Sequence, residues 1–140
     1  MMLMTALSDN PIHCLRCNGE VEPEATPLPA ELVQGVAHWC WIASALERLE
    51  LDSGAYEAWA QGELLNLWSP LNEEGLALRS KLDQVRRCYY VLFQLMDPDT
   101  TDGFIVPDGC PLCGGLFTQY VSKWFTRLIC ENCSLALVNV

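Results

Sequence analysis

The chain has 140 residues, a net charge of −10 and eight cysteines, and 51% of its residues are hydrophobic. This length suits one domain, or one domain with a small appended module, and the apolar content allows a core and excludes a disordered chain. The acidic balance disfavours extended contact with a phosphate backbone.

The short apolar start lacks the basic region of a signal peptide, and no apolar run approaches the length of a membrane span. We therefore expect a cytoplasmic protein with no membrane partner. In that compartment the cysteines indicate metal or redox chemistry rather than a disulfide framework.

Three helices are expected in the middle of the chain. They follow a frayed tail over residues 1–10 and an extended, Pro- and Glu-rich segment over residues 11–28. The first helix is expected from Pro29, which suits the first helical position, to about Leu51. Apolar residues recur along it in steps of three and four, and the wide apolar face predicts a central helix.

A second helix is expected from Ala55 to about Leu67. Ser69 and Pro70 are typical of the cap and the first position of a third helix. The side chains expected in the core of these helices are Leu32, Val33, Val36, Trp39, Ile42, Ala43, Leu46, Leu49, Tyr56, Trp59, Leu64, Leu67, Trp68, Leu71, Leu78, Leu82 and Val85.

Short strands are expected in the last third of the chain. Residues 88–95 are aromatic and β-branched and favour a strand over the alternative of a continued helix. Residues 97–108 are typical of an acidic loop, rich in Asp, Thr, Gly and Pro. The further strand-like runs are residues 116–121, 124–129 and 135–140, with a hairpin tip at residues 121–124.

Four cysteines near the C-terminus have the spacing of a zinc site. Two residues separate Cys110 from Cys113, sixteen lead on to Cys130, and two more precede Cys133. Each short gap lets the chain curl so that both sulfurs face one ion, and sixteen residues suit a β-hairpin that brings the turns together. The alternative is four unmetallated thiols in a small sheet. We predict a structural Zn²⁺ with no open position for catalysis.

A second Cys-x-x-Cys, made by Cys14 and Cys17, has no matching pair in the sequence. The candidates to complete a second zinc site are His13, His38, Cys40 and Cys88. Cysteines in apolar segments, such as Cys40 and Cys88, are more often simple buried thiols, and the alternative for His38 is a helix-surface residue. A degenerate site and a metal shared between two chains are the other options. A redox role is disfavoured, because Pro- and Glu-rich residues follow instead of a helix N-terminus.

Six of the eight basic residues are candidates for contact with nucleic acid, although a solvated helix face explains most of them. They are Arg79, Lys81, Arg86, Arg87, Lys123 and Arg127. Calcium is not expected, because Asp97, Asp99, Asp102 and Asp108 lack the spacing of an EF-hand. No nucleophile–base pair, phosphate-binding glycine loop or zinc-helix motif is present, so we predict neither an enzyme nor a small-molecule substrate.

Several segments together resemble a bacterial family of uncharacterised proteins. They are the run Ser69 to Gly75, the Tyr89-Tyr90 strand, the turn Cys110-x-x-Cys113-Gly114-Gly115, the closing Cys130-x-x-Cys133-Ser134-Leu135 and the early Cys14-x-x-Cys17-x-Gly19. The family is described as zinc-ribbon-containing and is suggested to bind nucleic acid, and the resemblance covers about Cys14 to the C-terminus. It implies the same four zinc ligands. Ser134 is a departure, since members tend to carry a basic residue there.

The expected fold is α+β. Residues 1–108 are expected to hold the N-terminal Cys-x-x-Cys segment and the helical region, and residues 109–140 an antiparallel zinc ribbon, in which the metal replaces a core too small to fold alone. The expected function is a non-enzymatic interaction or regulatory module that acts through a protein partner, which the acidic charge favours. The alternative is a nucleic-acid-binding zinc-ribbon protein, which the resemblance favours.

Overall fold

The computed structural model describes residues 1–5, 10–22, 25–96, 103–123 and 125–138. Its helices are α1 (Ala30–Asp52), α2 (Glu57–Leu65) after the 3-10 turn η2 (Gly54–Tyr56), and α3 (Pro70–Val85). Its strands are β1 (Met2–Leu3), β2 (Ile12–His13), β3 (Tyr89–Val91), β4 (Thr118–Val121), β5 (Thr126–Cys130) and β6 (Leu135–Leu137). The chain thus combines helices with a sheet, and its cysteine cluster lies in the C-terminal region.

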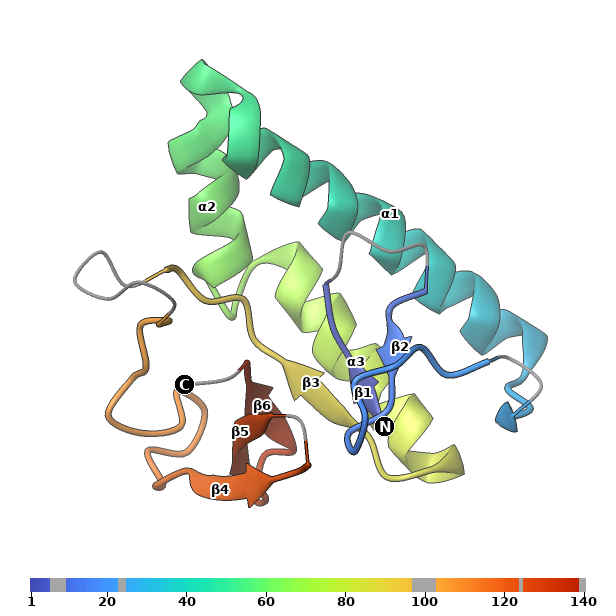
Figure 1. The fold of residues 1–140 in the computed structure, drawn as a ribbon. Helices are drawn as coiled ribbons and strands as arrows, with labels where there is room; N and C mark the ends of the chain where they lie inside the picture. The colour runs from blue at the N-terminus through green and yellow to red at the C-terminus, as the bar shows by residue number, and fades with distance from the viewer. Residues whose placement is uncertain (6–9, 23–24, 97–102, 124, 139–140) are drawn as a thin grey trace.

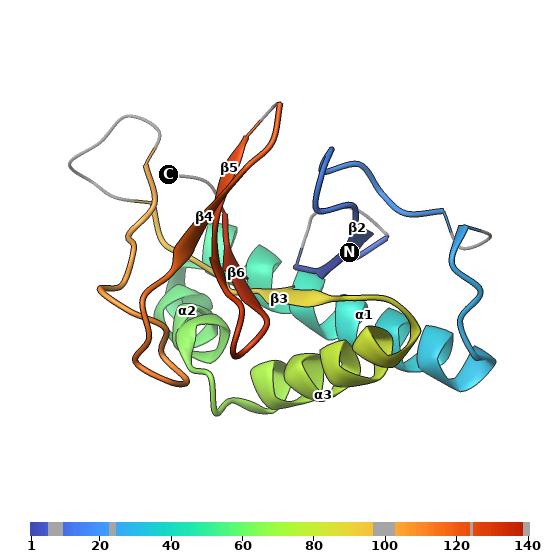
Figure 2. The same cartoon turned by 90° about the horizontal axis from the view of Figure 1, so that it is seen from below.

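The strands of the described residues form one sheet in the order β2-β1-β3-β6-β5-β4. The inner strand β3 pairs in parallel with β1 on one side and with β6 on the other, whereas the remaining pairs are antiparallel. The three helices lie on one side of β3 (Figure 1). The β4–β5 hairpin and the N-terminal segment project from the opposite side (Figure 2).

The helix boundaries follow from local capping. α3 begins as predicted, because Ser69 Oγ accepts a hydrogen bond from the Asn72 N–H at 3.3 Å and Pro70 occupies the first turn, where its missing N–H costs nothing. α1 begins at Ala30, so Pro29 is the N-cap rather than the first helical residue. Within the described ranges, no helix has both the length and the apolar composition needed to cross a membrane.

Part of the predicted core lies on the surface. The periodic face of α1 is buried as predicted and contains Leu32, Val36, Trp39, Ala43 and Leu46. Six other core predictions are wrong, because these side chains lie on the solvent side of the helices or of the turns that join them. The exposed residues are Val33, Ile42, Tyr56, Trp59, Trp68 and Val85. α1 is therefore covered along one side only and is not the central helix that its apolar width predicts.

The prediction of a frayed N-terminal tail is also wrong for residues 1–5, whereas residues 6–9 lie outside the described residues. Met2 and Leu3 are fully buried and form β1, which pairs in parallel with the first residues of β3. Leu3 belongs to the main core under the helices, whereas Met2 belongs to a smaller cluster with Tyr89 and Ile129. Successive side chains of a strand point to opposite faces, so the sheet buries apolar residues on both faces.

Tyr90 in β3 connects the sheet to the helices. Its ring lies edge-on to Trp39 of α1 with 5.9 Å between centroids, and its hydroxyl donates to Asn72 Oδ1 at 2.7 Å. The Asn72 amide donates in turn to two backbone oxygens at the end of α2, at 3.0 and 2.9 Å. Gly75 of α3 makes room for the ring, since a Cβ built there would lie 2.5 Å from it.

We predict that Gly75→Ala destabilises the protein, although alanine is the better helix former. The added methyl would overlap the Tyr90 ring, and overpacking of this kind costs about 1–3 kcal/mol. Gly62→Ala in α2 is the matched control, because nothing lies within 4 Å of a Cβ there and helix propensity should stabilise it by up to about 1 kcal/mol. Urea unfolding should give effects of opposite sign; a stabilising Gly75→Ala would contradict the contact.

Candidate metal centre

The sulfur atoms of Cys110, Cys113, Cys130 and Cys133 all lie within 4.8 Å of one another, and those of Cys113 and Cys130 are 3.6 Å apart. A tetrahedral ion with metal–sulfur bonds of about 2.3 Å separates its sulfurs by about 3.8 Å. The four thiols therefore fit a single metal ion. Cys110 and Cys130 are buried while Cys113 is exposed, so the cluster is closed toward the core and opens to the surface.

Two tight backbone turns hold these sulfurs. In the first, the Cys110 N–H donates to the Gly115 oxygen at 2.8 Å and the Gly114 N–H donates to the Cys110 oxygen at 2.7 Å. Gly114 has a φ of 69°, which glycine adopts without steric cost. In the second turn Ser134 has a φ of 52° at the equivalent position, one residue after the second cysteine. This uncommon conformation is held between β5 and β6, which the turn connects.

The thiols of the cluster differ in pKa: that of Cys113 is lowered, whereas those of Cys130 and Cys133 are raised. The Gly115 backbone N–H, with smaller contributions from the neighbouring cysteines, lowers the pKa of Cys113 to about 7. Burial, followed by the neighbouring cysteines, raises the pKa of Cys133 to about 12, and burial also raises the pKa of Cys130. A bound cation must displace these protons. Metal affinity at this cluster should therefore fall as the pH falls.

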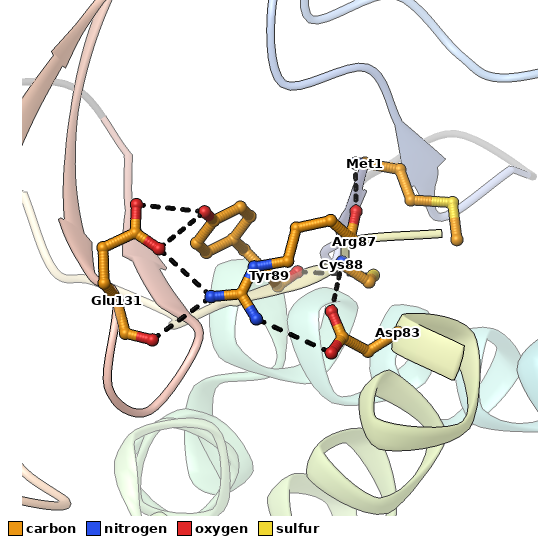
Figure 3. A network of polar contacts seen from close by, with 6 residues as sticks. All are labelled: Met1, Asp83, Arg87, Cys88, Tyr89 and Glu131. Carbon is orange, nitrogen blue, oxygen red and sulfur yellow. Dashed lines mark hydrogen bonds and ion pairs between the residues drawn. The ribbon is translucent and has the colours of Figure 1, made fainter. Parts of the chain in front are cut away.

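A polar network attaches the second turn to β3 and α3 (Figure 3). Glu131, inside the turn, accepts hydrogen bonds from the Tyr89 hydroxyl at 2.9 Å and from Arg87 Nη2 at 3.1 Å. Arg87 also lies 3.6 Å from Asp83, which accepts the Cys88 N–H at 2.8 Å. The turn is thus tied to the inner strand of the sheet. Sequence reasoning missed Glu131, because its partners lie far away in the chain and no local pattern marks them.

The N-terminal Cys-x-x-Cys forms a turn of the same kind. The Cys14 N–H donates to the Gly19 oxygen at 2.8 Å, the Asn18 N–H donates to the Cys14 oxygen at 2.9 Å, and Asn18 has a φ of 58°. Burial opposes ionisation of Cys14, but the N–H groups of Arg16 and Cys17 outweigh it and its pKa is lowered. A turn without a helix is not the arrangement of a redox pair at a helix N-terminus.

The side chains considered as further ligands of this pair lie elsewhere. Both ring nitrogens of His13 face backbone carbonyl oxygens, at 2.9 and 3.0 Å. His38 is exposed on α1, whereas Cys40 and Cys88 are buried in the core, where burial raises the pKa of Cys88 to about 12. In the described part of the chain, no third potential ligand joins Cys14 and Cys17.

Of the six basic residues considered for nucleic acid, three have local roles or acidic neighbours and a fourth is half-buried. Arg87 is paired within the network above, and Arg127 is buried and donates to the side chain of Asn18. Lys81 shares a groove with two glutamates, and Arg79 is half-buried on α3. These four residues therefore do not form one open basic surface.

The other two, Arg86 and Lys123, line adjoining parts of one groove between the N-terminal turn and the β4–β5 hairpin. Cys14, Arg16 and Tyr120 line both parts, and none of the described residues that line them is acidic. Sequence reasoning missed Arg16, because Arg16 is far from Arg86 and Lys123 along the chain and only the fold brings it near them.

Some predicted features fall outside the described residues. They are the aspartates Asp97, Asp99 and Asp102 and the hairpin-tip residue Trp124. Beside the tip, the Ser122 N–H donates to the Phe125 oxygen at 2.9 Å, which closes the connection between β4 and β5.

Comparison with known proteins gives no match: no family model, no curated protein and no solved structure matches this chain.

We predict that Cys113→Ser lowers the metal content by about one ion per chain relative to the unchanged protein, because a closed site needs all four sulfurs. Elemental analysis after purification without chelator measures this. Cys40→Ala is the control, since this thiol is buried away from the cluster, and it should leave the metal content unchanged. Equal metal content in Cys113→Ser and the unchanged protein would contradict the site.

Proposed function

We propose that the protein is a non-enzymatic interaction module of the α+β class whose C-terminal region is a zinc ribbon. Four thiolates in two short turns are the donors that Zn²⁺ prefers, and four protein ligands leave no open position for substrate or water. Such a centre is structural. The ion would supply folding free energy on the order of 10 kcal/mol to a region whose outer strand, β4, has no buried residue.

An apolar groove beside the cysteine cluster carries the proposal of a protein partner. It has a volume of about 370 Å³ between α2 and the segments that follow β3 and precede the cluster, and Gln94 is the only polar residue among the described residues that line it. Leu65 and Ile105 in its wall are 43% and 50% exposed. Apolar side chains exposed around a groove are typical of a binding surface. Pro111 also lines it, so the metal-bound turn would fix one wall.

The charge of the chain favours a basic partner. The net charge is −10, and the aspartates Asp97, Asp99 and Asp102 directly follow the groove-lining residues 92–95 in the sequence. A protein segment with an apolar centre and flanking Lys or Arg residues would bury its apolar side chains in the groove. Its charges would also speed association with an acidic chain. We take such a basic segment as the occupant.

We predict that Ile105→Glu weakens binding of this partner at least tenfold, about 1.4 kcal/mol, because a carboxylate would be desolvated in the groove. Leu116→Glu is the control, since Leu116 is 82% exposed and does not line the groove. Proteins captured from a nuclease-treated lysate would be compared between the two variants and then measured by calorimetry. Absence of any protein that is lost with Ile105→Glu and retained with Leu116→Glu would refute the proposal.

Nucleic acid is a second candidate ligand, which the groove between the N-terminal turn and the β4–β5 hairpin favours. Arg16, Arg86 and Lys123 line it beside the Tyr120 ring, and its lining holds no acidic side chain among the described residues, in a chain with 18 acidic residues. Cations that contact phosphates and an aromatic ring that stacks on a base are the features of single-strand binding surfaces.

If this groove binds single strands, the double substitution Arg86→Ala and Lys123→Ala should weaken binding and reduce its salt dependence. Gel-shift titrations with single-stranded DNA and RNA at several salt concentrations measure both quantities. Arg48→Ala, an exposed position on α1, should leave both unchanged. Binding that is absent at low salt, or equally sensitive to the two changes, would remove nucleic acid as a ligand of this groove.

A further inference from the structure

The N-terminal cysteine turn has the geometry of the metal-site turn and not only its sequence spacing. The cysteine N–H to glycine oxygen distance is 2.8 Å both in Cys14–Gly19 and in Cys110–Gly115, and the second hydrogen bond of the turn measures 2.9 and 2.7 Å. The residue after the second cysteine is left-handed in each, with φ values of 58° and 69°.

The following glycine also occupies the same place in both turns. A Cβ built at Gly19 would lie 3.6 Å from the Cys17 sulfur, and one built at Gly115 would lie 3.3 Å from the Cys113 sulfur. The N-terminal turn is therefore shaped to present two sulfurs to one ion, as the C-terminal turn is.

This turn holds only half of a thiolate site. Among the described residues no third donor lies near Cys14 and Cys17, and Cys17 is exposed while Cys14 is half-buried. Zinc in a structural site takes four protein ligands. Within the described residues the site is thus incomplete, and the surface where Cys17 is exposed is open to donors from another molecule.

The surroundings of the turn favour the charge of a completed site. Zn²⁺ with four thiolates carries a formal charge of about −2. Both Arg16 and Lys123 line the groove beside the turn, where no acidic residue lies among those that the structure describes. Two copies of this chain, each with a net charge of −10, repel one another on average. Because the described lining of this groove is basic and not acidic, two copies repel one another less at this face than their net charge implies.

The position of the turn also suits contact with a second molecule. The turn lies on the N-terminal segment, which projects from the sheet on the side opposite the helices, as the β4–β5 hairpin does (Figure 2). The buried Arg127 of β5 donates to the side chain of Asn18, so the turn is anchored and pre-shaped. Beside it, Val121 lines the same groove and is 70% exposed, and a second copy would cover this apolar side chain.

We propose that Cys14 and Cys17 are half of a second zinc site, and that the same two cysteines of a second copy of this chain complete it. One Zn²⁺ then joins two copies about a two-fold axis, because a tetrahedron of four equivalent sulfurs is matched by two identical pairs. This site is additional to the closed centre of the proposed function and independent of its apolar groove.

The test is the mass and the metal content of the full chain, measured together in a reducing buffer that prevents disulfides. Light scattering during size-exclusion chromatography should give a dimer with about 1.5 zinc ions per chain, one closed and half of one shared. A chelator should dissociate the dimer. Cys17→Ser, at an exposed side chain, should give a monomer that retains one ion, whereas Cys40→Ala should still dimerise.

The remaining outcomes overturn the proposal. A monomer with two ions would show a site closed within one chain, and a monomer with one ion would show that the pair is not a site. A dimer that survives chelation or Cys17→Ser would have another interface.

The charge argument is tested separately. The double substitution Arg16→Glu and Lys123→Glu should raise the dissociation constant of the dimer at least tenfold, while Arg48→Glu, with a charge change on the exposed surface of α1, should have a much smaller effect. If Arg48→Glu weakens the dimer to the same extent per charge, the two copies do not meet at this groove and the proposal fails.

Discussion

The docking of Tyr90 onto α3 determines how the sheet sits on the helices. The ring passes so close to Gly75 that no larger residue fits, and its hydroxyl is held by Asn72, whose amide closes the turn between α2 and α3. Because Tyr90 belongs to the inner strand, this single contact orients β1 and β6 as well. A buried hydrogen bond of this kind fixes one arrangement, since breaking it would leave polar groups unpaired in the core.

The cysteine cluster depends on the same strand. β6 begins two residues after Cys133 and pairs directly with β3. Glu131 inside the turn accepts hydrogen bonds from Tyr89 and Arg87. The cluster is thus attached to the sheet through its backbone and through one carboxylate. In the proposed function, the ion at this cluster and the groove beside it then act as one rigid unit.

The sequence predicts those parts of the fold that depend on neighbouring residues. The periodic apolar positions and the Ser69 cap locate α1 and α3, and the glycines after Cys113 predict the first cysteine turn. Prediction fails where the partner is distant. Nothing in Met2-Leu3 indicates a buried strand, because its partner β3 follows the whole helical segment. Trp59 and Trp68 are large apolar residues and are expected in the core. Both are exposed, and only the packing of α2 and of the turn after it shows this.

The candidate site shows the same division. Spacing alone brings Cys110, Cys113, Cys130 and Cys133 to one place, because each short gap is a local turn. The shape of the Cys14–Gly19 turn has a local signal too, since Asn is among the few residues other than glycine that readily adopt a left-handed conformation. The closeness of Arg16 and Lys123 has no local signal in the sequence, because it depends on how the N-terminal segment lies against the β4–β5 hairpin.

The parallel pairing of β3 on both sides has a consequence for the order in which the protein forms. A parallel neighbour cannot be reached by a tight turn, so both partners of β3 are joined to it by long stretches of chain. During synthesis β1 is made before the strand that it pairs with. Met2 and Leu3 therefore stay uncovered until the helices and β3 have been made. β6 is made after the other described strands, shortly after Cys133 of the cluster. Such distant pairings fold slowly and expose apolar segments to aggregation, so the helical hairpin of α1 and α2 is the natural place for folding to start.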